Sequence, residues 1–245
     1  MTLRWFIGTS GWHYPHWRGV FYPEKLPSRD WLDFYARHFD SVEINSSFYR
    51  LPTEQAVARW QRVTPDDFHF AAKGSRFISH MKKLSNINDS LVIFIDRLSG
   101  LGHKLGPVLF QTPPSWRKDM SRLAAFLSLL PRGREWVFEF RHSSWHCEET
   151  YRLLHDHQAA FCIYDLAGFT SPAMITTDFA YLRLHGPAAA YCGRYGEERL
   201  APWVEWLAKQ SKLRQVYAYF DNDQAAYAAE DARLFRQLAG LPVLP

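Results

Sequence analysis

The sequence contains few cysteines and no long apolar run. Its three cysteines, Cys147, Cys162 and Cys192, are odd in number and lack the short paired spacing of zinc sites, which favours free thiols in a reducing compartment. No window approaches the roughly 18 consecutive apolar residues of a membrane span, and the first residues lack the apolar stretch of a signal peptide. We therefore expect a cytoplasmic protein with no membrane partner.

Runs of like charge and composition breaks are also absent. The chain has 29 Lys and Arg against 25 Asp and Glu, a formal net charge of +4, and these charges are spread along all 245 residues. Such a balance permits nucleic acid as a partner but does not favour one. Because no linker or low-complexity tract is present, we expect one domain over residues 1–245.

Aromatic residues, in contrast, make up 16% of the chain. This content favours a large core and a pocket walled by rings. Trp12, Tyr14, Trp17 and Trp145 are predicted to be exposed, and bases can stack on such rings beside cations. They support one alternative for the function, a non-catalytic binding module for a nucleotide or nucleic acid.

Apolar and β-branched residues gather in eight short segments that we predict to be strands. Helical periodicity lies between most of them, and neither a hairpin signal nor a glycine-rich phosphate loop is present. This alternation implies parallel strands joined by helices, and eight such units close into a TIM (β/α)8 barrel, with an open doubly wound sheet as the alternative. Residues 166–178 leave room only for a short or broken helix. The predicted strands are 3–7, 41–45, 68–73, 106–111, 136–140, 159–164, 179–184 and 215–220, and the predicted helices are 30–38, 53–63, 89–101, 119–130, 148–157, 202–213 and 223–238.

Charged and polar residues follow the apolar part of nearly every predicted strand. Residues 136–146, WVFEFRHSSWH, are the clearest case. An unpaired buried ion is very costly, so the charged residues at the end of this buried strand are expected to line a cleft. In a (β/α)8 barrel the strand ends meet at one mouth, and residues two apart, such as Glu139 and Arg141, share a face. The residues predicted at this mouth are Glu43, Asn45, Lys73, Arg76, Gln111, Glu139, Arg141, Asp165, Arg183, His185, Asp221 and Asn222, with the rings of Trp12 and Trp145 beside them.

These residue types admit more than one chemistry. Four acids face four permanent cations, so a purely structural ion-pair network is one interpretation, although buried pairs seldom outperform apolar packing. The acids and His185 could bind a divalent metal, but Lys and Arg interleave with them, and the sequence requires no cofactor. A retaining glycosidase needs a close carboxylate pair, and none stands out. Anion binding by Lys73, Arg76, Arg141 and Arg183 fits best.

Seven motifs in this order resemble the DUF72 (YecE-like) family. They are IGTSGWHYPHWRGVFYP, VEINSSFYRLP, FAAKGSRFISH, VLFQTPPSW, VFEFRHSSW, YLRLHG and YAYFDND, and they cover essentially the whole chain. The resemblance implies a TIM barrel but no reaction, because the family is named for its unknown function. It also implies a shared cleft formed by Glu43, Lys73, Glu139, Arg141, Asp165, Arg183, His185, Asp221 and Asn222.

We therefore expect an enzyme, a hydrolase, lyase or isomerase, that acts on a phosphorylated or carboxylated small molecule. In this hypothesis Lys73, Arg141 and Arg183 hold the anion, and residues 185–196, HGPAAAYCGRYG, could close over it. Glu139 or Asp221 acts as general base, and His185 moves the proton because its ordinary pKa lies near neutrality. Glu43 is a further catalytic candidate. A hydrolase or isomerase that depends on a divalent metal is the remaining alternative.

Overall fold

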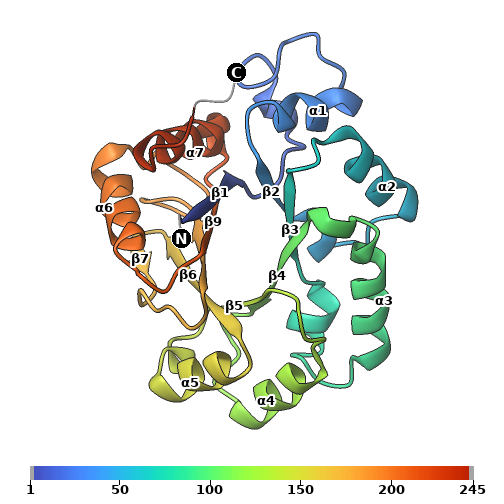
Figure 1. Cartoon of the computed structure of the whole chain (residues 1–245), viewed down its shortest axis with the longest axis vertical. Helices are drawn as coiled ribbons and strands as arrows, with labels where there is room; N and C mark the ends of the chain where they lie inside the picture. The colour runs from blue at the N-terminus through green and yellow to red at the C-terminus, as the bar shows by residue number, and fades with distance from the viewer. Residues whose placement is uncertain (1–2, 243–245) are drawn as a thin grey trace.

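The strands of the computed structural model curve into one barrel with the helices outside it (Figure 1). The structure describes residues 3–242. Within them, eight parallel strands follow the order β1-β9-β8-β6-β5-β4-β3-β2, and the predicted (β/α)8 barrel is confirmed. These strands are β1 (Arg4–Thr9), β2 (Ser41–Ile44), β3 (His69–Lys73), β4 (Leu105–Thr112), β5 (Trp136–Phe140), β6 (Ala159–Leu166), β8 (Phe179–Leu184) and β9 (Gln215–Phe220).

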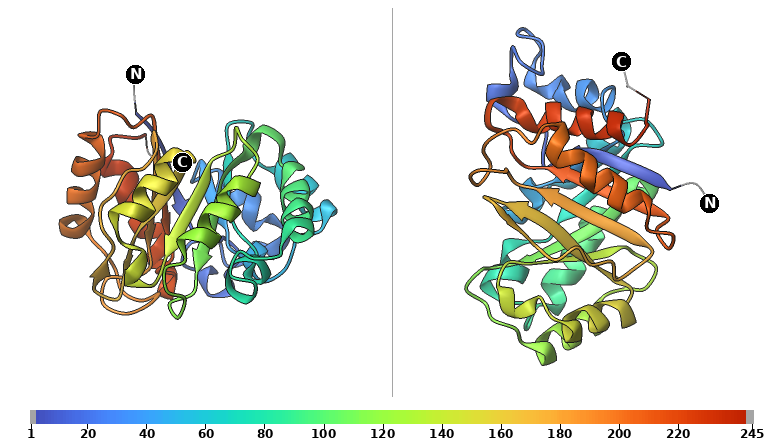
Figure 2. Two further views of the ribbon diagram at one scale, coloured as in Figure 1. Left: turned by 90° about the horizontal axis from the view of Figure 1, so that it is seen from below. Right: turned by 90° about the vertical axis from the view of Figure 1, so that its left-hand side faces the viewer.

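Seven α-helices within residues 3–242 cover the strands, as the two side views show (Figure 2). They are α1 (Trp31–Ala36), α2 (Glu54–Val63), α3 (Asn88–Ser99), α4 (Met120–Leu129), α5 (Glu148–Asp156), α6 (Glu197–Ala208) and α7 (Tyr227–Leu238). The apolar run at residues 92–95 is helical, as predicted, and leaves Val92 and Ile93 exposed on α3. The predicted start of α6 is wrong by five residues, because Pro202 lies inside the helix rather than at its beginning. Every one of these helices falls short of the length and apolar character that a membrane crossing requires.

The barrel closes where β1 meets β2, and this seam has little backbone pairing. One parallel bridge joins Ser10 to Glu43, and the amide of Gly11 donates to the carbonyl of Glu43 at 2.8 Å. Gly8 permits the close approach of the two strands, because a Cβ at this position would collide with the carbonyl of Ser41. Any larger residue at position 8 would therefore push the seam apart.

The hydroxyl of Tyr35 supplies hydrogen bonds that the seam lacks. Tyr35 lies on α1 with no exposed surface, and its hydroxyl accepts from the amide of Thr9 at 2.9 Å. The same hydroxyl donates to the carbonyl of Ser41 at 3.1 Å. One side chain thus links β1 to β2 where no ladder does.

The connection from β6 to β8 contains no α-helix in the part of the chain that the structure describes. Instead, β6 pairs in antiparallel fashion with the two-residue strand β7 (Phe169–Thr170), and side chains of the following segment bind β6. The hydroxyl of Ser171 accepts from the amide of Tyr164 at 2.9 Å, and that of Thr176 accepts from Phe161 at 2.9 Å. The predicted shortage of helix in residues 166–178 is confirmed.

The large aromatic core is confirmed, but the predicted exposure of three tryptophans is wrong. Trp12, Trp17 and Trp145 are 8%, 0% and 0% exposed. The indole of Trp145 stacks on Phe140 at 4.7 Å and donates to the carbonyl of Trp116 at 2.9 Å. Loops that carry tryptophans fold back onto the barrel because each ring buries a large apolar area.

Candidate functional site

Side chains from three strands meet in a layer beneath the mouth of the barrel. Arg183 of β8 has no exposed surface, and its guanidinium donates to Glu43 of β2 at 2.7 Å and to Glu139 of β5 at 2.7 Å. Glu139 and Arg183 point inward because alternate residues of their strands face the barrel interior. Arg183 therefore neutralises two buried carboxylates and makes no contact with an open cavity.

The two carboxylates beneath the mouth have no free oxygen. Glu43 also accepts from the hydroxyls of Tyr181, at 2.6 Å, and Ser10. Glu139 also accepts from the amide of Gln111 at 2.8 Å and from Arg141. Burial alone would raise the pKa of Glu139, but the neighbouring guanidinium groups outweigh it and hold this pKa well below its usual range. Glu139 is therefore a poor proton acceptor.

His185 and Asp221 form a pair just above this layer. The Nδ1 atom of His185 lies 2.9 Å from Oδ2 of Asp221. Its Nε2 atom lies 2.9 Å from Arg141 and 3.2 Å from Arg183. Because a guanidinium only donates, Nε2 accepts and the imidazole proton sits on Nδ1. Burial raises the pKa of Asp221, but the hydrogen bond from His185 and the charges of Arg183 and Lys73 outweigh this and lower it.

An open cavity of about 590 Å³ lies at the mouth, beside Arg141. The guanidinium of Arg141 lies 4.7 Å over the ring of Tyr164, and its side chain is 10% exposed. Its NH1 nitrogen makes no hydrogen bond within residues 3–242. Tyr164 and Tyr191 form part of an aromatic wall, and His80, Gln111 and His142 supply polar groups. Tyr191 belongs to the loop that was predicted to close over a ligand.

Lys73 brings a second positive charge to the mouth from the end of β3. It is 7% exposed, and its ammonium lies 4.4 Å over the ring of Phe48. Burial and the nearby Arg183 lower the pKa of Lys73 to about 8, although acids of the barrel partly offset them. Burial, with the charges of Lys73 and other cations, also lowers the pKa of His80 to about 4.

Two residues of the predicted cleft face away from the mouth. Asp165 follows the inward-facing Tyr164, so strand alternation turns it outward, where it accepts from the hydroxyl of Tyr195 at 2.7 Å. Asn222 likewise follows Asp221, and it donates to the carbonyl of Gly193 at 2.8 Å. Both residues hold the loop after β8 in place.

The remaining predicted residues are spread around the mouth. Arg76 is exposed just beyond β3, and Asn45 is half-buried beside Tyr14. Trp12 and Trp145 are buried and contribute packing. Sequence reasoning missed His80 and His142, although both lie in the conspicuous motifs FAAKGSRFISH and VFEFRHSSW.

The acids at the mouth do not fit a resident metal ion. Within the described residues 3–242, no group of three or more His, Cys, Asp and Glu side chains could hold one. Glu43 and Glu139 bind Arg183 instead, and a guanidinium takes the oxygens that a divalent cation would need.

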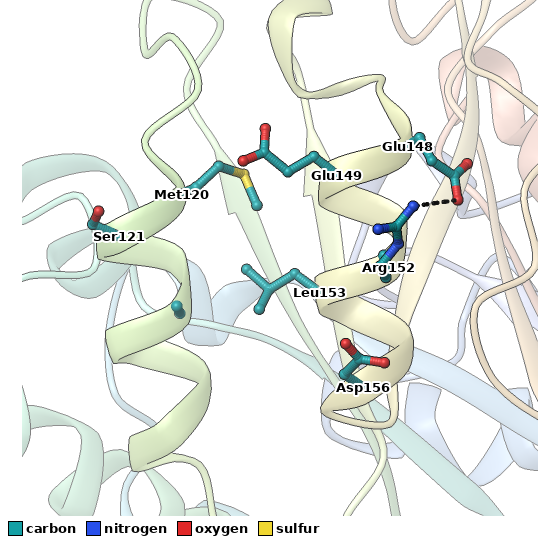
Figure 3. A pocket seen from close by; sticks show the side chains of 8 residues that line it. Met120, Ser121, Glu148, Glu149, Arg152, Leu153 and Asp156 are labelled. Carbon is teal, nitrogen blue, oxygen red and sulfur yellow. Dashed lines mark ion pairs between the residues drawn. The ribbon is translucent and has the colours of Figure 1, made fainter.

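A second cavity of about 650 Å³ lies outside the barrel between α4 and α5. Met120 and Leu153 face each other across it, and Arg152 pairs with Glu148 at 3.9 Å on its rim (Figure 3). None of the strand-end residues lines this groove. The candidate site is therefore the cavity at the mouth.

Comparison with known proteins identifies the family. The model of a family described as "Protein of unknown function DUF72" matches residues 6–244. The chain belongs to the DUF72 family. The resemblance that the motifs indicated is thereby confirmed. The family description names no reaction, so the function of this DUF72 barrel has to be argued from its site.

Relatives and solved structures agree with this assignment. The UPF0759 protein YecE of Escherichia coli is 34% identical over 138 residues, which cover 56% of this chain and 48% of YecE, about half its length. The UPF0759 protein YunF of Bacillus subtilis is 25% identical over 95% of this chain and 94% of its own. A DUF72 protein of Thermotoga maritima has a TM-score of 0.85 and 29% identity, over 97% of this chain and 99% of that one.

Proposed function

We propose that this DUF72 protein is an enzyme that acts on a small molecule carrying a phosphate or carboxylate, bound at the mouth of the barrel. One observation supports this most strongly. Arg141 brings positive charge with an unused donor to an open cavity, and the unpaired ammonium of Lys73 lies behind its wall, over a Phe48 ring that packs on the cavity-lining His80. The acids beneath are already neutralised by Arg183. Cationic donors with spare capacity at a barrel mouth suit an anion.

Arg141 is the principal ligand of the anion in this proposal. Its Nε and one NH2 hydrogen are engaged by Glu139 and His185, which fix the plane of the guanidinium. The free NH1 edge can then donate to an oxyanion without reorganisation. Arg183, which is fully buried, acts as a positioning residue for Glu139 rather than as a ligand.

Proton transfer is assigned to the Asp221–His185 pair. Asp221 is preferred to Glu139, because only one of its oxygens is hydrogen-bonded within residues 3–242, whereas both oxygens of Glu139 are occupied. Nε2 of His185 accepts a hydrogen bond from Arg141 in the structure. Once a bound substrate draws Arg141 toward itself, His185 can move a proton between Asp221 and that substrate. Hydrolysis, elimination and isomerisation of an anionic substrate all use such a pair.

A thermal-shift series tests the anion site. Inorganic phosphate, glucose 6-phosphate and citrate should raise the melting temperature with increasing concentration, because each binds the folded state alone. Arg141→Ala should abolish this rise, whereas Arg214→Ala, which removes a surface arginine paired with Asp178 just before β9 begins and hence at the opposite end of the barrel, should retain it. An equal rise in both variants would contradict the proposal, and a rise with Mn²⁺ or Zn²⁺ alone would favour the metal alternative.

A binding module for single-stranded nucleic acid is the second candidate. Of the predicted stacking residues, the three tryptophans are buried and Tyr14 is half-buried, but Tyr49 and Phe77 are 73% and 38% exposed near the mouth. Lys82 lies 5.5 Å over the ring of Phe77, and Arg76 is exposed next to it. Retention of single-stranded DNA or RNA on filters that falls steeply with salt would favour this function.

A further inference from the structure

Lys73 differs from the other deeply buried lysine of the chain. Lys104 is 2% exposed, and its ammonium donates to the carbonyls of Gln61 at 2.6 Å and Thr64 at 2.7 Å. Lys73 is 7% exposed, yet its ammonium makes no hydrogen bond and no ion pair within residues 3–242. Buried lysines are almost always paired, so an unpaired one at the mouth of a barrel calls for a function.

The surroundings of Lys73 disfavour its charged form. Burial removes water from around the amine, and Arg183 adds like charge from the floor of the mouth. The face of the Phe48 ring attracts the ammonium but does not offset these two effects. Glu43, Glu139 and Asp221 act on it only from beyond ion-pair distance. With a pKa of about 8, roughly a tenth of Lys73 is uncharged at pH 7, against less than a thousandth of an ordinary lysine.

We propose that Lys73 is a nucleophile that forms an imine with an aldehyde or ketone whose anionic group is held by Arg141. This inference rests on the proposed function and specifies its substrate class. The position of Lys73 supports it, because the residue ends β3 on the inward face and its ammonium lies over the ring of Phe48. That ring packs 4.9 Å from the ring of His80, which lines the same cavity as Arg141.

The covalent step balances without an oxidant or a reductant. The nitrogen lone pair of Lys73 attacks the carbonyl carbon, and the carbonyl oxygen takes up a proton to give a carbinolamine. Loss of that oxygen as water then forms the C=N bond. Asp221, the acid with an unused oxygen, accepts the proton that the amine releases and returns it to the carbonyl oxygen. A second proton, from solvent, lets that oxygen leave as water. The protonated imine keeps a positive charge at Nζ and draws electrons from the adjacent bonds, as lyases and isomerases require.

Reductive trapping tests the imine. The whole protein is incubated with glyoxylate and sodium cyanoborohydride, and the modified lysines are located by peptide mass spectrometry. We expect Lys73 to gain a carboxymethyl group at least about tenfold faster than the exposed Lys82, because the lowered pKa of Lys73 leaves far more of its amine uncharged than in an ordinary lysine. Lys104, whose amine is buried and hydrogen-bonded, should stay unmodified. Labelling of Lys73 no faster than Lys82 would overturn the proposal.

Two variants separate this inference from the anion site. Lys73→Arg should lose the labelled peptide but keep stabilisation by phosphate. Arg141→Ala should slow labelling of Lys73 by glyoxylate but not by acetaldehyde, which has no anionic group to hold. If phosphate stabilises the protein and Lys73 is not labelled, the imine is wrong and the anion site stands. If phosphate does not stabilise the protein either, both proposals fail.

Discussion

At the scale of single residues, the cations at the mouth differ in whether acids neutralise them. Arg183 is paired with buried carboxylates, whereas Arg141 keeps an unused donor. Alternation along β5 and β8 predicted that Glu139 shares a face with Arg141 and that Arg183 shares one with His185, and in the structure both pairs face inward. The sequence could not tell that Arg183 would lie below Arg141 and take up both Glu43 and Glu139. That difference depends on how far each residue lies along its strand, which the period of two does not encode.

The same alternation explains the two misplaced residues. Asp165 and Asn222 directly follow inward-facing residues, so each belongs to the outward face of its strand end. Their polar character and their position at the end of a strand predicted that they lie at the mouth. Strand alternation instead places both side chains on the outward face, where they contact the loop after β8. A count of parity from Cys162, which faces the barrel interior, would have predicted this for Asp165.

Replacement of the buried amine of Lys73 by an apolar side chain should raise the free energy of unfolding. Holding the pKa of Lys73 near 8 rather than 10.5 costs at most about 3.5 kcal/mol at pH 7, because each pKa unit is worth roughly 1.4 kcal/mol. We expect Lys73→Met to raise the free energy of unfolding at pH 7 by about 1–3 kcal/mol while ligand stabilisation weakens. Urea unfolding at pH 7 measures this change.

The pH dependence of that gain has a definite sign. Between pH 8 and 10.5 the unfolded chain keeps a proton on Lys73 that the folded protein has lost, so the stability of the unmodified protein rises relative to the variant. The advantage of Lys73→Met should therefore be fully present below pH 8 and shrink toward pH 10.5. A destabilised variant, or an advantage that grows with pH, would contradict the account of Lys73.

At the scale of elements, the helices and strands were largely predictable, and the seam was not. The strand segments and the helix at α3 follow directly from apolar periodicity. The β1–β2 seam depends on a tyrosine hydroxyl and on Gly8, neither of which changes the hydrophobic pattern. The burial of Trp12 and Trp17 also depends on contacts between loops, which periodicity does not report.

Tyr35→Phe tests the seam. Loss of the hydroxyl leaves the buried amide of Thr9 without this acceptor, which we expect to cost about 1–3 kcal/mol of unfolding free energy. Chemical denaturation of Tyr49→Phe provides the matched control, because Tyr49 is 73% exposed. Equal stability of the two variants would show that the seam does not depend on Tyr35.

At the scale of the whole molecule, eight parallel strands bring side chains that are far apart in sequence to one mouth. Glu43 and Arg183 are 140 residues apart, and they meet because β2 and β8 end on the same side of the barrel. The sequence predicted this convergence once the eight strands were recognised. It could not predict the shape of the cavity, because Tyr191 and His80 reach it from loops.

The most direct test of the anion site is a crystal structure of the protein grown or soaked with tungstate, a strongly scattering oxyanion of the same geometry as phosphate. The account predicts tungstate in the cavity at the barrel mouth, within hydrogen-bonding distance of Arg141 and next to Lys73. Tungstate bound only at exposed side chains such as Arg76 and Lys82, with none beside Arg141, would contradict it.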